Sequence, residues 1–137
     1  MTFVVFKIGG ICLGLRCGID IVEISRIKKT LENQGERFKA RVFTDIEIIY
    51  CESKKNNSVE SFAAAFCAKE AVSKALGSGF SMGVEMKDIE VIHDENGRPS
   101  VKLYNNAERV FEEIGASQIA ISLSHCREYA TANCVIC

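Results

Sequence analysis

The 137-residue sequence has little that would interrupt regular structure: one proline, at Pro99, and 10 glycines. Its apolar share of 47% and charged share of 26% are those of a globular domain, so disorder and fibrous repeats are excluded. The sequence also lacks an excess of charge of either sign. It has 17 basic and 18 acidic residues, and its net charge is −1. Such a chain has no overall field to hold DNA or RNA, and we expect no nucleic-acid partner.

Long apolar runs are absent as well. Residues 1–17 are apolar but contain Lys7 and Arg16, and have no uninterrupted run near the ~20 residues that a membrane span needs. Lys7 lies inside the apolar stretch rather than before it, unlike the charge of a signal peptide. We therefore expect no membrane anchor and a cytoplasmic location, with residues 1–17 as an N-terminal extension or extra strand and residues 18–137 as a single domain.

The seven cysteines lack the paired spacing of a disulfide scaffold. Cys134 and Cys137 form one Cys-x-x-Cys pair, but a tetrahedral zinc site would need a second pair, and only the loosely spaced Cys12 and Cys17 could offer one. Reduced, buried thiols are the simpler interpretation.

Apolar periodicity and turn residues predict the secondary structure. Thr44 and Glu47 have the spacing of a capping box, which begins a helix. Gly77 can end one in the left-handed conformation, and Asn96-Gly97 favours a tight turn between strands. In chain order the patterns predict a strand over 11–22, a helix from Ile24 to a stop at Gly35, a helix from 44 to about 53, a helix over 59–76, a hairpin around 94–97, a helix over 107–114, and strands over 119–124 and 129–136.

This order predicts an α+β fold, with a largely antiparallel sheet packed with helices rather than alternating parallel units.

The predicted helix over 59–76 is mostly apolar and leaves one polar stripe, formed by Lys69, Glu70, Ser73 and Lys74. Glu70 and Lys74 lie one turn apart, so a carboxylate and an ammonium project together. The stripe is either an ordinary solvated edge with a favourable ion pair or the wall of a site.

Asp20 interrupts a predicted core strand, where it lies between two isoleucines. A carboxylate buried there costs several kcal/mol unless it is paired or bound to a cation. Arg26 or Lys74 would suffice as a partner, and so would a metal. If Asp20 and Glu70 converge, two carboxylates with open remaining positions suit Mg²⁺, which keeps waters and recruits phosphate oxygens, and Lys74 would lie beside that phosphate.

The segment Ser122-Leu-Ser-His125 ends a predicted strand. Its hydroxyls and imidazole together can bind a phosphate, although a histidine at a strand end can equally be a surface residue. No nucleophile-elbow glycines flank either serine, so a serine hydrolase is not indicated. The glycine-rich loop 77–83 lacks the lysine and following helix of a phosphate-binding loop. The other histidine, His93, has no supporting neighbours in sequence.

Residues 26–41 carry six basic side chains against two acidic ones, the basic residues being Arg26, Lys28, Lys29, Arg37, Lys39 and Arg41. This run is either a solvated helix face or a docking surface for an acidic partner.

Three motifs occur together in a fixed order: Gly18-Ile-Asp-Ile-Val-Glu-Ile24, Phe66-Cys-Ala-Lys-Glu-Ala-Val-Ser-Lys-Ala-Leu-Gly77 and Ser122-Leu-Ser-His125. The combination resembles the bacterial holo-acyl-carrier-protein synthases, the short type of the 4′-phosphopantetheinyl transferase superfamily. The resemblance runs from about Gly18 to the end of the sequence and implies the fold of that superfamily.

It also implies an activity: transfer of 4′-phosphopantetheine from coenzyme A to a serine of apo acyl carrier protein, with release of adenosine 3′,5′-bisphosphate, Mg²⁺ as the ion, and fatty acid biosynthesis as the setting. In such an enzyme Asp20 and Glu70 bind the metal. Glu70, Lys74 and His125 are the catalytic set, with Lys74 on the pyrophosphate and His125 at the nucleotide end. Residues that look similar to those bordering the coenzyme are Ser73, Gly77, Asn96 and Pro99.

The resemblance also gives the basic run a purpose, because acyl carrier proteins are acidic. We expect the docking residues to be Arg26, Lys29, Arg37 and Arg41. The resemblance to the short synthases also implies a homotrimer with its sites at the subunit boundaries. One departure is Ala65, where many relatives carry a basic residue that Lys69 or a neighbouring subunit could replace. The alternatives are a non-catalytic module that binds an acidic helical partner through the basic run over 26–41, and a carboxylate–metal phosphohydrolase.

Overall fold

The computed structural model describes residues 4–8, 11–77 and 80–137. Its main sheet has four strands in the order β1-β2-β6-β5, and every neighbouring pair is antiparallel. The strands are β1 (Val4–Ile8), β2 (Ile11–Glu23), β5 (Ile119–His125) and β6 (Tyr129–Ile136). A separate antiparallel hairpin consists of β3 (Ile89–His93) and β4 (Pro99–Leu103). The predicted α+β fold with a largely antiparallel sheet is confirmed.

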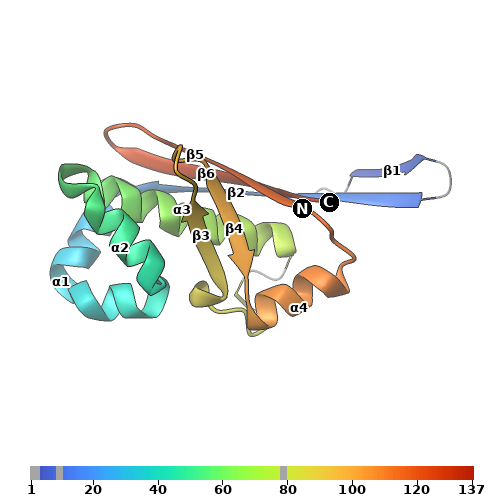
Figure 1. Cartoon of the computed structure of the whole chain (residues 1–137), viewed down its shortest axis with the longest axis horizontal. Helices are drawn as coiled ribbons and strands as arrows, with labels where there is room; N and C mark the ends of the chain where they lie inside the picture. Colours follow the sequence, from blue (N-terminus) through green and yellow to red (C-terminus); the bar gives the residue numbers. More distant parts are fainter. Residues whose placement is uncertain (1–3, 9–10, 78–79) are drawn as a thin grey trace.

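The helices lie on one side of this sheet (Figure 1). They are α1 (Ile24–Val42), α2 (Asp45–Ser53), α3 (Ser58–Leu76) and α4 (Asn105–Glu113), and two short 3-10 turns, η1 (Lys55–Asn57) and η2 (Met86–Asp88), join them to their neighbours. Helix α3 is central, because it contacts β2, β5 and β6 on one side and α1, α2, α4 and β3 elsewhere.

Small residues allow α3 to approach the sheet closely. Ala71 and Ala75 are fully buried against β2. A Cβ at Gly18 would clash with the Ala71 carbonyl oxygen and lie 2.7 Å from the Ala75 nitrogen. Glycine is therefore required at position 18 by the neighbouring helix backbone.

Several predicted boundaries are confirmed by hydrogen bonds or backbone angles. Thr44 N donates to Glu47 Oε2 at 2.8 Å and Glu47 N donates to Thr44 Oγ1 at 3.4 Å, so the capping box at the start of α2 is present. Gly77 ends α3 with φ of 90°. The hairpin turns at Gly97, with φ of 79°.

The predicted stop at Gly35 coincides with a kink in α1, but the helical segment that follows the kink was not predicted. Gly35 has the non-helical angles φ 18° and ψ −103°, but α1 resumes after this kink and continues to Val42. Phe38 and Val42 of the segment after the kink are buried in the core, and these apolar contacts stabilise the second helical segment.

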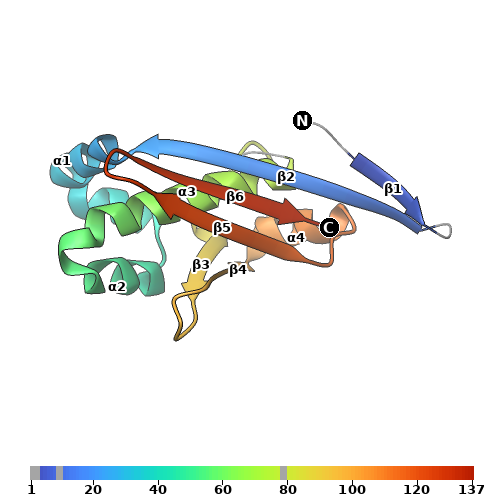
Figure 2. The same ribbon diagram turned by 90° about the horizontal axis from the view of Figure 1, so that it is seen from above.

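The N-terminal strands form a hairpin that extends beyond the rest of the sheet (Figure 2). Val4 pairs with Leu15 and Ile8 with Ile11. The expectations for residues 1–3 and 9–10 lie outside the described residues, and the division of the chain at residue 18 stays a prediction. Within the described part of the chain no helix has the length and hydropathy needed to cross a bilayer.

The cysteine side chains that the structure describes are free thiols, and three of them, Cys51, Cys67 and Cys134, are buried. The pKa of each of these three thiols is raised to about 12, mainly because burial disfavours the charged thiolate.

Candidate functional site

An ion pair joins β2 to α3. Lys74 Nζ lies 2.8 Å from Asp20 Oδ1 and also donates to the Ile19 carbonyl oxygen at 3.0 Å. Side chains two residues apart in a strand point to the same side, so Asp20 shares the α3 side of β2 with Gly18 and Val22. Of the two protein partners that the sequence left open for Asp20, the structure selects Lys74.

Glu70 lies one turn before Lys74 and belongs to the same cluster. Burial raises the pKa of Glu70, the Asp20 charge raises it further, and Lys74 lowers it. Asp20 and Glu70 line one hollow of about 430 Å³, together with Arg26 and Arg41 of α1. The structure thus brings together the two carboxylates, and places Lys74 and two arginines around them.

These residues fit a magnesium ion by their chemistry. Among the described residues no group of three or more His, Cys, Asp or Glu side chains could hold a metal, so a fully protein-ligated site is not present there. Mg²⁺, however, commonly uses one or two carboxylates and fills its other positions with water and substrate phosphate. The repulsion between Asp20 and Glu70 is the kind of interaction that a divalent cation relieves.

The other half of the predicted polar stripe is not a solvated edge. Lys69 is completely buried, and its Nζ lies 2.7 Å from Glu47 Oε2, 3.0 Å from the Met86 oxygen and 2.7 Å from the Ile89 oxygen. Ser73 is also fully buried, and its hydroxyl has no hydrogen-bond partner among the described residues. Because all three ammonium protons of Lys69 are used, the suggestion that it replaces a basic residue missing at position 65 is wrong.

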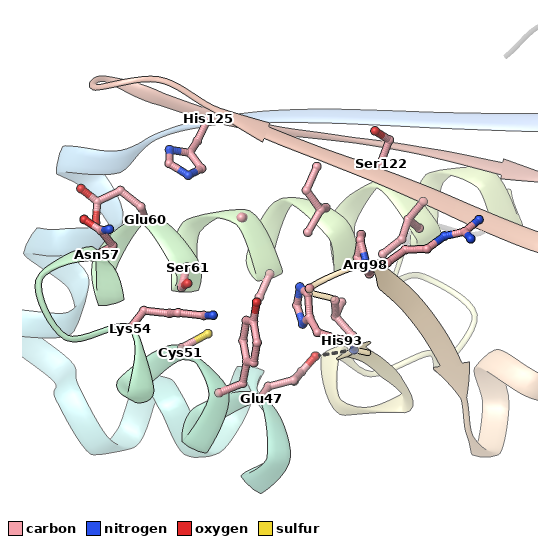
Figure 3. A pocket seen from close by; sticks show the side chains of 18 residues that line it. Glu47, Cys51, Lys54, Asn57, Glu60, Ser61, His93, Arg98, Ser122 and His125 are labelled. Carbon is pink, nitrogen blue, oxygen red and sulfur yellow. Dashed lines mark hydrogen bonds between the residues drawn. The ribbon is translucent and has the colours of Figure 1, made fainter. Parts of the chain in front are cut away.

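A second hollow, of about 530 Å³, lies between α2, α3, the β3–β4 hairpin and β5 (Figure 3). It contains His125 and Pro99 from the sequence prediction, together with Gly97 of the predicted turn. Asn96 is in that turn but does not line the hollow, and Ser73 and Gly77 line neither hollow.

Among the other residues that line this hollow, Tyr50, Lys54 and His93 were not predicted from the sequence. Arg98, which lies within the predicted Asn96–Pro99 turn, also lines the hollow. His93 was expected to have no supporting neighbours, but its ring stacks on Tyr50 with centroids 3.9 Å apart and planes 4° apart. That expectation is wrong because the contact joins residues from different elements.

One copy of the chain does not join the two hollows. Ser61 and Ala65 of α3 line the His125 hollow, whereas Phe66 and Glu70 line the Asp20 hollow. Positions 61 and 65 share one face of a helix, and positions 66 and 70 share another. His125 therefore lies on a different side of α3 from the Asp20–Glu70 cluster.

The four predicted docking residues, Arg26, Lys29, Arg37 and Arg41, are all exposed on α1. Lys39, by contrast, is paired with Glu52 at 2.8 Å and Glu36 at 3.2 Å.

The family model described as the 4′-phosphopantetheinyl transferase superfamily matches residues 16–134. The chain belongs to this superfamily. A relative from Ruminiclostridium cellulolyticum named holo-[acyl-carrier-protein] synthase is 47% identical over 119 residues, which is 87% of this chain and 89% of the relative. A synthase of the same name from Koribacter versatilis is 43% identical over 89% of this chain and 97% of its own length.

Solved structures of this superfamily agree with the fold. The holo-[acyl-carrier-protein] synthase of Neisseria meningitidis is 30% identical with a TM-score of 0.79, and covers 88% of this chain and 96% of its own. The Helicobacter pylori synthase in complex with coenzyme A is 30% identical with a TM-score of 0.76, over 88% of this chain and 99% of its own.

Proposed function

We propose that this transferase moves 4′-phosphopantetheine from coenzyme A to a serine of apo acyl carrier protein, giving holo carrier protein and adenosine 3′,5′-bisphosphate. The observation that carries the proposal is the cluster of Asp20, Glu70 and Lys74 beside Arg26 and Arg41, in a chain similar over most of its length to holo-[acyl-carrier-protein] synthases. The similar Helicobacter pylori structure holds coenzyme A, which supports the same donor here.

In the proposed reaction the carrier serine Oγ bonds to the phosphorus that carries the pantetheine arm. The bond from that phosphorus to the oxygen shared with the nucleotide breaks, and adenosine 3′,5′-bisphosphate leaves. The serine proton passes to the Glu70 carboxylate. Catalysis of such a step depends on cations placed near the phosphate oxygens, because charge develops there as the bond breaks.

Lys74 is the cation that the chain itself supplies. Its ammonium is held by Asp20 and by the Ile19 carbonyl oxygen, so it is in place before the coenzyme binds. Asp20 and Glu70 would hold Mg²⁺, which supplies further positive charge to the pyrophosphate when it is bound.

The acidic carrier docks on α1 in this proposal. Arg26 and Arg41 border the carboxylate cluster, and Lys29 and Arg37 extend the positive surface along the same helix. Opposite charges increase the rate of encounter and orient the partner. The proposal extends to fatty acid biosynthesis as the setting and the cytoplasm as the location.

We further propose a homotrimer in which the two hollows form one site across a subunit boundary. The face of the sheet turned away from α3 exposes Ile19 (63%) and Ile21 (65%), together with Leu15 (40%). Contiguous apolar side chains on an open sheet face are typical of a surface covered by another protein. A neighbouring copy would bring its His125 hollow, with Arg98 and Pro99 for the nucleotide, to the Asp20–Glu70 cluster.

The transfer is tested by the intact mass of an apo acyl carrier protein after incubation with the enzyme, coenzyme A and Mg²⁺. We expect a gain of one phosphopantetheine, which requires coenzyme A and is lost when a chelator removes the metal. Folded Glu70→Gln and Asp20→Asn variants should give no gain. Full activity in either variant would contradict the assigned roles, and no gain with the unmodified enzyme would contradict the transfer itself.

The shared site is tested by mixing inactive variants. Subunits of Glu70→Gln and His125→Ala, unfolded and refolded together, should recover activity, because some boundaries combine the two intact halves. The matched control combines Glu70→Gln with Asp20→Asn, which both damage the same half and should recover nothing. Absence of recovery in the first mixture, with trimers formed, would place each site within one subunit.

A further inference from the structure

Helix α1 is bent at a single residue. Gly35 has the non-helical angles φ 18° and ψ −103°, and it separates a first helical segment, residues 24–34, from a second one, residues 36–42. In Figure 1 the helix bends at the left end of the molecule instead of running straight. A glycine inside a helix favours such an interruption, because its helix propensity is low and its backbone has the most freedom to lose.

Both segments of α1 line the hollow that contains Asp20 and Glu70. The first segment contributes Arg26 and the second contributes Arg41. In a straight helix these two arginines would be separated by about 22 Å along the axis. The hollow has a volume of about 430 Å³, and a compact space of that size is much shorter than this separation. The bend therefore explains how one helix places both arginines around the same hollow.

Side-chain contacts fix the second segment to the neighbouring helices. Phe38 is buried, and the centroid of its ring lies 6.3 Å from that of Phe66 on α3. Lys39 is paired with Glu52 on α2 at 2.8 Å. Phe66 also lines the hollow and lies one turn before Glu70 on the same face of α3. The direction of the second segment is thus set relative to the helix that carries Glu70.

The second segment presents Arg41 to a partner. Its side chain is exposed, and among the residues that the structure describes it has no carboxylate within ion-pair distance. Lys39 of the same segment differs, because Glu36 and Glu52 already neutralise it. Arg41 is therefore the cation of this segment that lies at the hollow and is available to an acidic group.

We propose that Gly35 is a positioning residue for recognition of the acyl carrier protein. By bending α1 it holds Arg41 at the hollow of the two carboxylates, where the guanidinium pairs with an acidic side chain near the carrier serine. This inference rests on the proposed function, in which that serine reaches Glu70. Arg26 precedes the bend, so its position does not depend on Gly35. The binding of coenzyme A does not depend on the bend either.

The first test is Gly35→Ala. A Cβ at this position would meet nothing within 4 Å, so alanine fits, and its higher helix propensity favours a straight α1. We expect KM for an apo acyl carrier protein to rise about threefold to tenfold, the range for loss of a partly exposed ion pair. KM for coenzyme A should be unchanged and the Tm should not fall.

Two further variants serve as comparisons. Gly35→Asn introduces a residue with a lower helix propensity than alanine, so it should raise KM for the carrier less than Gly35→Ala does. Gly14→Ala is the matched control, because a Cβ there also meets nothing within 4 Å and Gly14 lies in β2, outside the hollow. It should leave both KM values unchanged.

The second test identifies the arginine that the bend positions. In an Arg41→Ala background, Gly35→Ala should raise KM for the carrier no further, because the guanidinium that the bend positions is already gone. In an Arg26→Ala background the same substitution should keep its full effect, since Arg26 belongs to the segment before the bend.

Each outcome has one meaning. An unchanged KM for the carrier in Gly35→Ala would overturn the positioning role, and so would an equal rise in KM for the carrier and for coenzyme A, which indicates a general distortion of the site. A full effect of Gly35→Ala in the Arg41→Ala background would show that the bend acts through another group. Failure of the unmodified enzyme to transfer phosphopantetheine is a different result, which would contradict the proposed function.

Discussion

The buried ion pair between Lys69 and Glu47 connects three parts of the molecule that shape the site. Lys69 on α3 donates to the Met86 and Ile89 oxygens next to β3, and Glu47 caps α2 while it accepts from Val91 N. Both side chains are almost completely buried. Replacement of Lys69 by methionine keeps most of the side-chain volume but leaves the carboxylate and two carbonyl oxygens without their shared donor.

The expected loss is large because an unpaired charge stays buried. Removal of one partner from a buried pair costs about 3–5 kcal/mol. For a chain of this length that corresponds to a fall in Tm of roughly 10–20 °C. The matched control is Lys39→Met, which removes a lysine paired with Glu36 and Glu52 near the surface and should cost about 0–1 kcal/mol.

The double variant separates pairing from simple volume effects. Burial raises the pKa of Glu47 and lowers that of Lys69, so the attraction between the two does not fully offset their loss of hydration. Lys69→Met combined with Glu47→Gln removes both charges, and should cost about 2 kcal/mol less than the sum of the single variants.

Urea denaturation and thermal unfolding at one fixed protein concentration measure these differences, because the stability of the proposed homotrimer would depend on concentration. A cost below about 1 kcal/mol for Lys69→Met, or strict additivity in the double variant, would refute the idea that a buried charge pair holds α2, α3 and β3 together.

Three further predictions concern other parts of the chain. Gly18→Ala should lower the free energy of unfolding by about 1–3 kcal/mol or more and reduce transfer, since its Cβ would clash with α3, while Gly14→Ala, which has open space, should change little in the same urea titration. Arg26→Glu should raise KM for the carrier protein about tenfold or more with KM for coenzyme A unchanged, and an unchanged carrier KM would remove the docking role. Hydrogen bonds from the Glu128 and Tyr129 backbone lower the pKa of the exposed Cys126, so its thiolate fraction rises at lower pH than in an ordinary cysteine. Treatment with iodoacetamide at mildly alkaline pH, followed by peptide mass mapping, should show Cys126 modified before the buried thiols. If Cys51, Cys67 or Cys134 of the folded protein is modified before Cys126, the prediction is wrong.

Local signals in the sequence predicted local structure well. The Thr44–Glu47 capping box, the left-handed Gly77 and the turn at Gly97 each depend on residues within a few positions of one another. Gly35 also interrupts the first helix as predicted, but the helical segment after it depends on the burial of Phe38 in the core, which no local signal reveals.

The site was harder to predict where a side chain's environment comes from distant segments. Nothing near Lys69 distinguishes it from the exposed Lys74, since its partners lie on α2, η2 and β3. The Tyr50–His93 stack likewise joins two elements without a common motif. Asp20 was noticed because a carboxylate among isoleucines is physically unusual, and that signal is present in the sequence itself.

The close approach of β2 and α3 explains why the first two motifs occur together. Gly18 lets the strand backbone reach Ala71 and Ala75, and Asp20, two residues further on the same side of the strand, then lies within 2.8 Å of Lys74. With a larger residue at 18 the two backbones would separate, and the ammonium could no longer contact both the carboxylate and the Ile19 carbonyl oxygen. The glycine, the alanines and the Asp20–Lys74 pair are therefore parts of one arrangement, and a change at position 18 should weaken transfer even where no reacting group has been altered.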